Sequence, residues 1–120
     1  MRVKTLVLGG MIAAAAWVGP GMATADLNEC DSGNLCMWGN NDYNWLIGER
    51  AGGGGTANLS GSGNNQMDSW ANTSSTYSGC MYADANGGGD KQTMGRVSRD
   101  NNVSSLNSDE VSSWKTNGSC

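Results

Sequence analysis

The chain has 120 residues, with 11 acidic and 7 basic side chains, a net charge of −4 and no histidine. The missing histidine excludes Ser-His-Asp and Cys-His catalysis, and no G-x-S-x-G or phosphate-binding-loop sequence is present. Nucleic acids and anionic membranes attract lysine and arginine, which are scarce here. We therefore expect no enzyme, no nucleic-acid partner and no membrane partner.

The first 25 residues predict a secretory signal peptide. Arg2 and Lys4 precede an uncharged apolar run at 5–18, and Ala23-Thr24-Ala25 is typical of a cleavage site. The apolar run is too short to favour the alternative, a membrane-spanning anchor. We expect secretion to the extracellular space and a single mature domain at 26–120, which keeps 5 basic and 11 acidic residues.

Four cysteines follow the signal peptide: Cys30, Cys36, Cys80 and Cys120. A short secreted chain buries a modest core, and disulfides commonly compensate for it. Four cysteines allow three pairings, and the sequence does not decide among them. We favour Cys30–Cys36 and Cys80–Cys120. The alternative of a structural zinc site is disfavoured because there is no C-x-x-C spacing and no histidine.

From residue 30 onward, short apolar clusters alternate with turn residues, and no stretch has the period of a helix. This rhythm is typical of an all-β domain with short strands. The four glycines at 52–55 predict a flexible loop, and Asn86-Gly87-Gly88-Gly89 predicts a hairpin turn. Residues 51–63 and 98–107 are polar, and we expect them to be the long connections of Greek-key units.

An offset of 44 residues separates Cys36 from Cys80 and also Trp70 from Trp114. The shared offset of such rare residues indicates a duplicated unit, at about 30–76 and 77–120. Each unit alone would expose an apolar face, so we expect two Greek-key units packed as a sandwich around one core. Four aromatic residues are expected to face that core: Trp38, Trp70, Tyr82 and Trp114.

Tyr43 and Trp45 have no aromatic counterpart 44 residues later, where Gly87 and Gly89 stand. We therefore expect Tyr43 and Trp45 to form an exposed contact surface rather than part of the duplicated core.

The segment Cys30-Asp31-Ser32-Gly33-Asn34-Leu35-Cys36-Met37-Trp38 resembles the start of secreted actinobacterial proteins of peptidase inhibitor family I36, which read C-x-x-G-x-x-C, apolar, aromatic. The resemblance implies a βγ-crystallin-like fold and inhibition of an extracellular protease through a rigid surface loop. The inhibitor that gives the family its name has a second short disulfide loop near mid-chain, whereas residues 77–82 here contain one cysteine.

The same fold often binds calcium through the pattern N/D-N/D-x-x-S/T-S, which residues 64–69 and 108–113 approximate. The resemblance implies a calcium site at Asn65, Ser69, Asp109 and Ser113. Such oxygen donors suit a hard cation, and the few carboxylates predict weak binding. The alternative is that these residues only shape turns through side-chain to backbone hydrogen bonds.

We therefore predict a secreted, monomeric protease inhibitor that requires no cofactor, with a calcium-binding module that lacks inhibitory activity as the alternative. A secreted toxin is a third possibility, which rests on analogy of fold alone.

Overall fold

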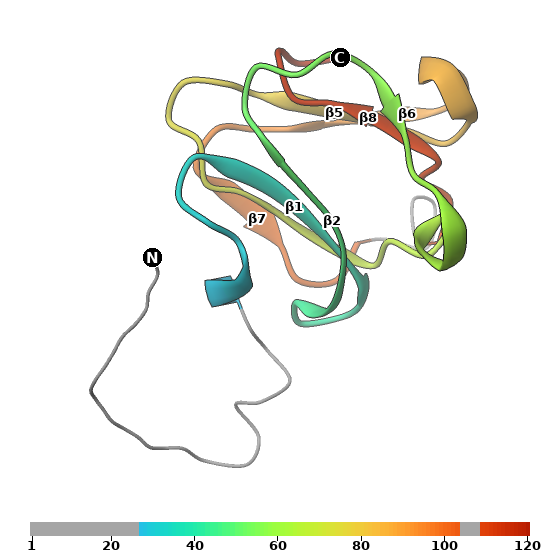
Figure 1. Cartoon of the computed structure of the whole chain (residues 1–120), viewed down its shortest axis with the longest axis horizontal. Helices are drawn as coiled ribbons and strands as arrows, with labels where there is room; N and C mark the ends of the chain where they lie inside the picture. Colours follow the sequence, from blue (N-terminus) through green and yellow to red (C-terminus); the bar gives the residue numbers. More distant parts are fainter. Residues whose placement is uncertain (1–26, 104–108) are drawn as a thin grey trace.

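The computed structural model describes residues 27–103 and 109–120, so the predicted signal peptide lies outside the described residues. Two four-stranded antiparallel sheets face each other, in the strand orders β2-β1-β4-β7 and β3-β8-β5-β6 (Figure 1). Their strands are β1 (Asn34–Asn40), β2 (Asn44–Ala51), β3 (Ala57–Asn58), β4 (Ser69–Asn72), β5 (Gly79–Tyr82), β6 (Lys91–Met94), β7 (Ser98–Asp100) and β8 (Ser113–Lys115). Three short 3-10 turns, η3 (Leu27–Glu29), η4 (Gly61–Gly63) and η5 (Ala85–Gly87), complete the described elements. The all-β fold predicted from the sequence is confirmed.

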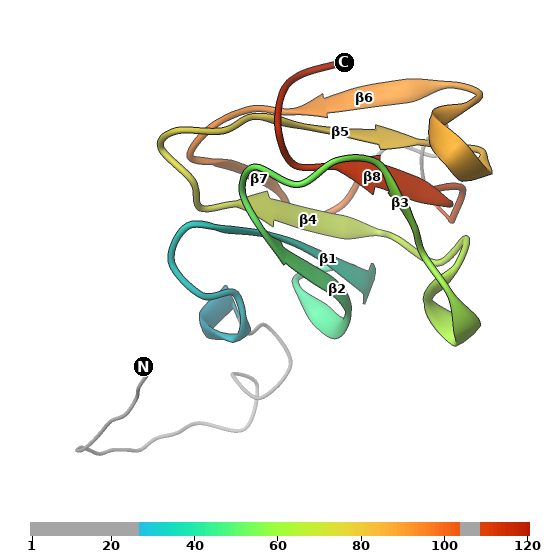
Figure 2. The ribbon, with the colours of Figure 1, turned by 45° about the horizontal axis from the view of Figure 1, so that its top comes forward.

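Each sheet takes three strands from one half of the chain and one from the other half. Strand β3 pairs with β8, and β7 pairs with β4 (Figure 2). The two segments expected to be long connections therefore each contain a short strand that crosses to the opposite sheet. Neither half of the chain completes a four-stranded sheet alone.

The pairing register repeats at the offset seen in the sequence. Met37 lies opposite Trp70 in the first sheet. Met81 lies opposite Trp114 in the second sheet. Met81 follows Met37 by 44 residues, and Trp114 follows Trp70 by 44 residues. The spacing shared by the cysteines and tryptophans therefore corresponds to the same strand pairing formed twice.

The main core lies between the two sheets. Its buried residues are Leu35, Met37, Met67, Trp70, Met81, Met94, Val103, Val111 and Trp114. Trp70 and Trp114 therefore face the shared core, as predicted.

The predicted positions of Trp38 and Tyr82 in this core are wrong. Successive strand residues alternate between faces, and Met37 takes the inward position, so Trp38 is buried on the outer face with Cys30, Cys36 and Tyr43. Tyr82 is half-buried and belongs to neither cluster.

The glycine run at 52–55 is docked, which corrects the expectation of a flexible loop. Gly53 N–H donates to the Thr116 carbonyl at 2.6 Å, and Thr116 N–H donates to the Gly54 carbonyl at 2.9 Å. A Cβ at Gly52 would lie 2.7 Å from a ring carbon of Tyr77. The missing side chains thus allow Tyr77 and the C-terminal segment to approach the backbone closely.

Two disulfides join Cys30 to Cys36 and Cys80 to Cys120, the pairing favoured from the sequence. The first fastens the chain next to η3, and the second fastens the last residue to β5. Among the described residues, no helix has the length and apolar character needed to span a membrane.

Candidate functional site

The described residues of the two polar-pattern copies, 64–69 and 109–113, form two adjacent loops, called the crossed loops below; Ser108 lies outside the described residues. Asn65 and Asp109 both adopt left-handed backbone conformations, with φ of 61° and 60°. Asn65 N–H donates to the Val111 carbonyl at 3.0 Å, and Asp109 N–H donates to the Met67 carbonyl at 2.9 Å. These bonds are equivalent under the 44-residue repeat, so the structure brings Asn65 and Asp109 together at a pair of crossed loops.

Two further side chains complete these loops. Ser112 Oγ donates to Asn65 Oδ1 at 2.6 Å. Asp109 is hydrogen-bonded to Asp68, and its pKa is raised by desolvation first, then by the charge of Asp68 and by the hydrogen bond itself. An open polar hollow beside the loops is lined by Asn65, Ala83, Asp84, Asp109 and Glu110.

Ser69 and Ser113, the other two residues predicted for the calcium site, are fully buried and have different partners. Ser69 Oγ donates to the Asn40 carbonyl at 2.7 Å and accepts from Tyr43 N–H at 3.1 Å. Ser113 Oγ bonds the equivalent atoms of the β5–β6 hairpin, the Asp84 carbonyl and Gly87 N–H. Both hydroxyls thus shape hairpins rather than face the crossed loops.

The sequence prediction missed Asp68 and Ser112, which lie one position earlier in each copy of the pattern. The 44-residue spacing does not single them out, because Ser69 and Ser113 have the same spacing.

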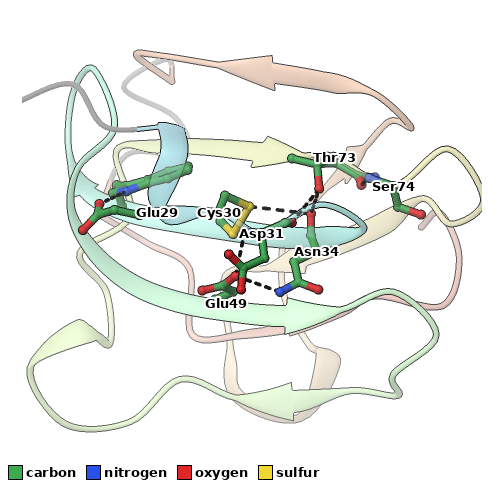
Figure 3. Close-up of a disulfide and its surroundings, with 10 residues drawn as sticks. Glu29, Cys30, Asp31, Asn34, Glu49, Thr73 and Ser74 are labelled. Carbon is green, nitrogen blue, oxygen red and sulfur yellow. Dashed lines mark hydrogen bonds between the residues drawn. A yellow bond between two sulfur atoms is a disulfide. The ribbon is translucent and has the colours of Figure 1, made fainter. Parts of the chain in front are cut away.

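The loop closed by Cys30 and Cys36 is held from two sides (Figure 3). From β2, Glu49 Oε2 accepts hydrogen bonds from Asp31 N–H at 2.9 Å and from Asn34 Nδ2 at 2.7 Å. From the segment after β4, Thr73 Oγ1 contacts the carbonyls of Asp31 at 3.0 Å and Asn34 at 2.8 Å. The exposed tip of this loop is therefore supported by side chains that lie distant in sequence.

The β1–β2 hairpin contains the two aromatic residues that were expected to be exposed, Tyr43 in its loop and Trp45 near the start of β2. Tyr43 is only 8% exposed, and its ring meets Trp38 edge to face at a centroid distance of 5.1 Å, so the prediction for Tyr43 is wrong. Burial is the main cause that raises the pKa of the Tyr43 hydroxyl. Trp45 is 43% exposed, as predicted.

The chain belongs to peptidase inhibitor family I36, whose family model matches residues 23–94. This is a family of inhibitors rather than of enzymes. No curated protein matches the sequence significantly.

Solved structures similar to this chain are βγ-crystallin domains. A betagamma-crystallin domain from Flavobacterium johnsoniae is 20% identical with a TM-score of 0.53, over 68% of this chain and 90% of that domain. A mutant betagamma-crystallin domain from Clostridium beijerinckii is 19% identical with a TM-score of 0.54, over 68% and 93%. The N-terminal domain of protein S is 20% identical with a TM-score of 0.53, over 68% and 92%. The likeness establishes the βγ-crystallin-like fold.

Proposed function

We propose that this chain is a secreted inhibitor that blocks an extracellular protease through a rigid surface loop. The observation that carries the proposal is the match to peptidase inhibitor family I36 over residues 23–94. In this proposal, residues 1–25 are removed on export and 26–120 act as a monomer made of units at about 30–76 and 77–120. The two disulfides fit secretion, because such bonds persist in oxidising compartments.

Rigidity is the physical property that supports this function. A preorganised surface loses less conformational entropy when it binds, and a protease cleaves folded chains mainly after local opening. The loop between Cys30 and Cys36 is fixed by Glu49 and Thr73, and the C-terminus is fixed to β5. Both features favour a chain that enters a protease cleft and leaves it intact.

Purified 26–120 is expected to inhibit at least one secreted metalloprotease or serine protease in a stoichiometric titration, and mass spectrometry should recover the chain uncut. The same protein after reduction and alkylation is the control, and it should lose inhibition because its loops are no longer fixed. If the oxidised protein inhibits no protease in a panel covering both classes, the proposed function is wrong.

Calcium binding is a second candidate function, supported by the crossed loops. The pairs Asn65–Ser112 and Asp68–Asp109 occupy equivalent positions and bring oxygen atoms together. Oxygen donors are the ligands that Ca²⁺ prefers, and a site with so few carboxylates should bind at about 10⁻⁴–10⁻³ M. We therefore propose Asp68 and Ser112 as ligands with Asn65 and Asp109, while Ser69 and Ser113 order the adjoining hairpins.

Calcium at 10 mM is expected to stabilise the folded chain by about 1.4–2.7 kcal/mol, because a ligand present at about 10–100 times its Kd favours the state that binds it. Melting curves with calcium and with a chelator measure this as a rise in Tm. Asp68→Ala should abolish the rise, whereas Asp90→Ala, an exposed carboxylate outside the crossed loops, should retain it. Coincident curves for the unmodified chain would exclude calcium.

The raised pKa of Asp109 fixes the direction of the pH dependence. Protons compete with calcium for this carboxylate, so the calcium effect should fade as pH falls through the raised pKa. Without calcium, the folded state holds the proton more tightly than the unfolded chain, so this group lowers stability as pH rises through the same range.

A further inference from the structure

The β1–β2 and β5–β6 hairpins have positive φ at equivalent positions of the repeat but carry different residues there. Tyr43 in the β1–β2 loop and Trp45 near the start of β2 have φ of 60° and 67°. Their counterparts in the β5–β6 loop, Gly87 and Gly89, have φ of 78° and 75°. Glycine adopts this left-handed region without steric penalty, whereas a bulky side chain is strained there. The first half therefore keeps two aromatic residues where its own backbone favours glycine.

Tyr43 has a structural reason for its strained conformation, because its ring is buried against Trp38. Trp45 has less compensation, since it is 43% exposed and belongs to neither buried cluster. Strained residues that burial does not explain are concentrated at functional sites.

The Trp45 ring lies over the backbone of Gly39. A Cβ at Gly39 would lie 2.1 Å from ring carbon Cε3, so the ring occupies the space that a side chain at position 39 would fill. Asn40, Asn41 and Asp42 beside it are exposed and polar. The β1–β2 hairpin thus presents an exposed aromatic ring with a polar rim.

Two other large apolar residues of the described chain are exposed, Tyr77 and Val97. Tyr77 packs over the glycine run at Gly52, so it has a structural role. Val97 is 69% exposed with φ of 50°, but its side chain is short and aliphatic. Trp45 is therefore the exposed residue best suited to contribute binding energy.

We propose that Trp45 anchors this chain to the protease that it inhibits, in an apolar recess on the enzyme surface. The inference rests on the proposed inhibitory function and identifies its contact residue. Tryptophan is enriched among residues that dominate binding energy, and such residues are commonly ringed by polar contacts that exclude water. Because the ring packs on the Gly39 backbone before binding, it has fewer positions to lose when the partner binds.

Trp45→Gly is the decisive variant, because it removes the ring and installs the residue that the backbone conformation favours. The inhibition constant should rise at least tenfold, while Tm stays equal or rises. Trp45→Asn should also lose inhibition because the ring is removed, and it should keep the fold because asparagine tolerates the left-handed conformation. Trp45→Phe keeps an aromatic ring and should retain most of the inhibition.

Val97→Gly is the matched control, because it also replaces an exposed apolar residue at positive φ. It should leave the inhibition constant unchanged while Tm again stays equal or rises. A role of Trp45 in folding alone predicts the opposite result for Trp45→Gly, a lower Tm with inhibition of the correctly folded fraction unchanged.

The outcomes separate this inference from the proposed function. If the unmodified chain inhibits and Trp45→Gly inhibits equally well, the inference is overturned and the inhibitory function stands. If the unmodified chain inhibits no protease, both are overturned.

Sedimentation with insoluble cellulose and chitin tests a different partner. If the unmodified chain is retained and Trp45→Gly is not, while inhibition is the same for both, the ring binds carbohydrate and the protease contact is overturned.

Discussion

Loss of the Cys80–Cys120 bond is expected to destabilise the domain by about 4 kcal/mol, about twice the effect of losing Cys30–Cys36. The two bonds have sequence separations of 40 and 6, and a longer loop restricts the unfolded chain more. The Cys80–Cys120 bond also secures the C-terminal residue to a buried position in β5. Urea unfolding of Cys80→Ala/Cys120→Ser and of Cys30→Ala/Cys36→Ala measures the two losses without leaving a free thiol.

Reduced, alkylated protein, which lacks both disulfides, is the control. Its free energy of unfolding should be no higher than that of the less stable double variant. Equal losses in both double variants would contradict the explanation by loop size. The cost would then come from native contacts at each bond rather than from the unfolded chain.

Replacing either buried tryptophan of the main core is expected to have a comparable effect. Trp70→Ala and Trp114→Ala should each lower the free energy of unfolding by about 3–5 kcal/mol, because a large core side chain is lost and a cavity remains. Trp70 is 5% exposed and Trp114 is 2% exposed. Chemical denaturation of 26–120 at a fixed temperature compares the two variants directly.

Phenylalanine substitutions sharpen this comparison. Trp70 Nε1 is buried without a hydrogen-bond partner in the part of the chain that the structure describes, so Trp70→Phe removes no bond seen there. Trp114→Phe weakens a contact in which the Arg50 guanidinium lies 5.4 Å from the Trp114 ring centroid. We therefore expect Trp114→Phe to lower the free energy of unfolding more than Trp70→Phe does. Trp45→Phe replaces an exposed residue and should change the free energy of unfolding by about 0.5 kcal/mol or less. Small losses from both alanine variants would mean that the sheets do not depend on a shared core.

The fold could be predicted because rare residues mark the repeat. Cys36, Cys80, Trp70 and Trp114 keep their spacing because they fill equivalent positions in the strand ladders. The exchange of β3 and β7 between sheets could not be predicted in the same way. These strands have two and three residues, which is too short for alternation of apolar and polar residues to be recognised.

The candidate site was predicted in part for a similar reason. Asn65 and Asp109 stand out as turn residues in equivalent copies of a pattern. A serine next to a strand, however, can bond either to its own hairpin or to a neighbouring loop, and the pattern does not choose between them. Ser69 and Ser113 bond to the hairpins. The misplacement of Trp38 has a related cause, since the sequence did not reveal which of Met37 and Trp38 points inward.

Each disulfide joins two cysteines of the same half, Cys30–Cys36 in the first half and Cys80–Cys120 in the second. The halves are therefore joined covalently only by the segment between β4 and β5. Each half nevertheless lends a strand to the other's sheet. The domain is thus built like a strand-swapped homodimer whose two subunits happen to be fused in tandem. One 44-residue unit on its own would have an incomplete sheet, and a second copy of itself would be the natural partner to complete it.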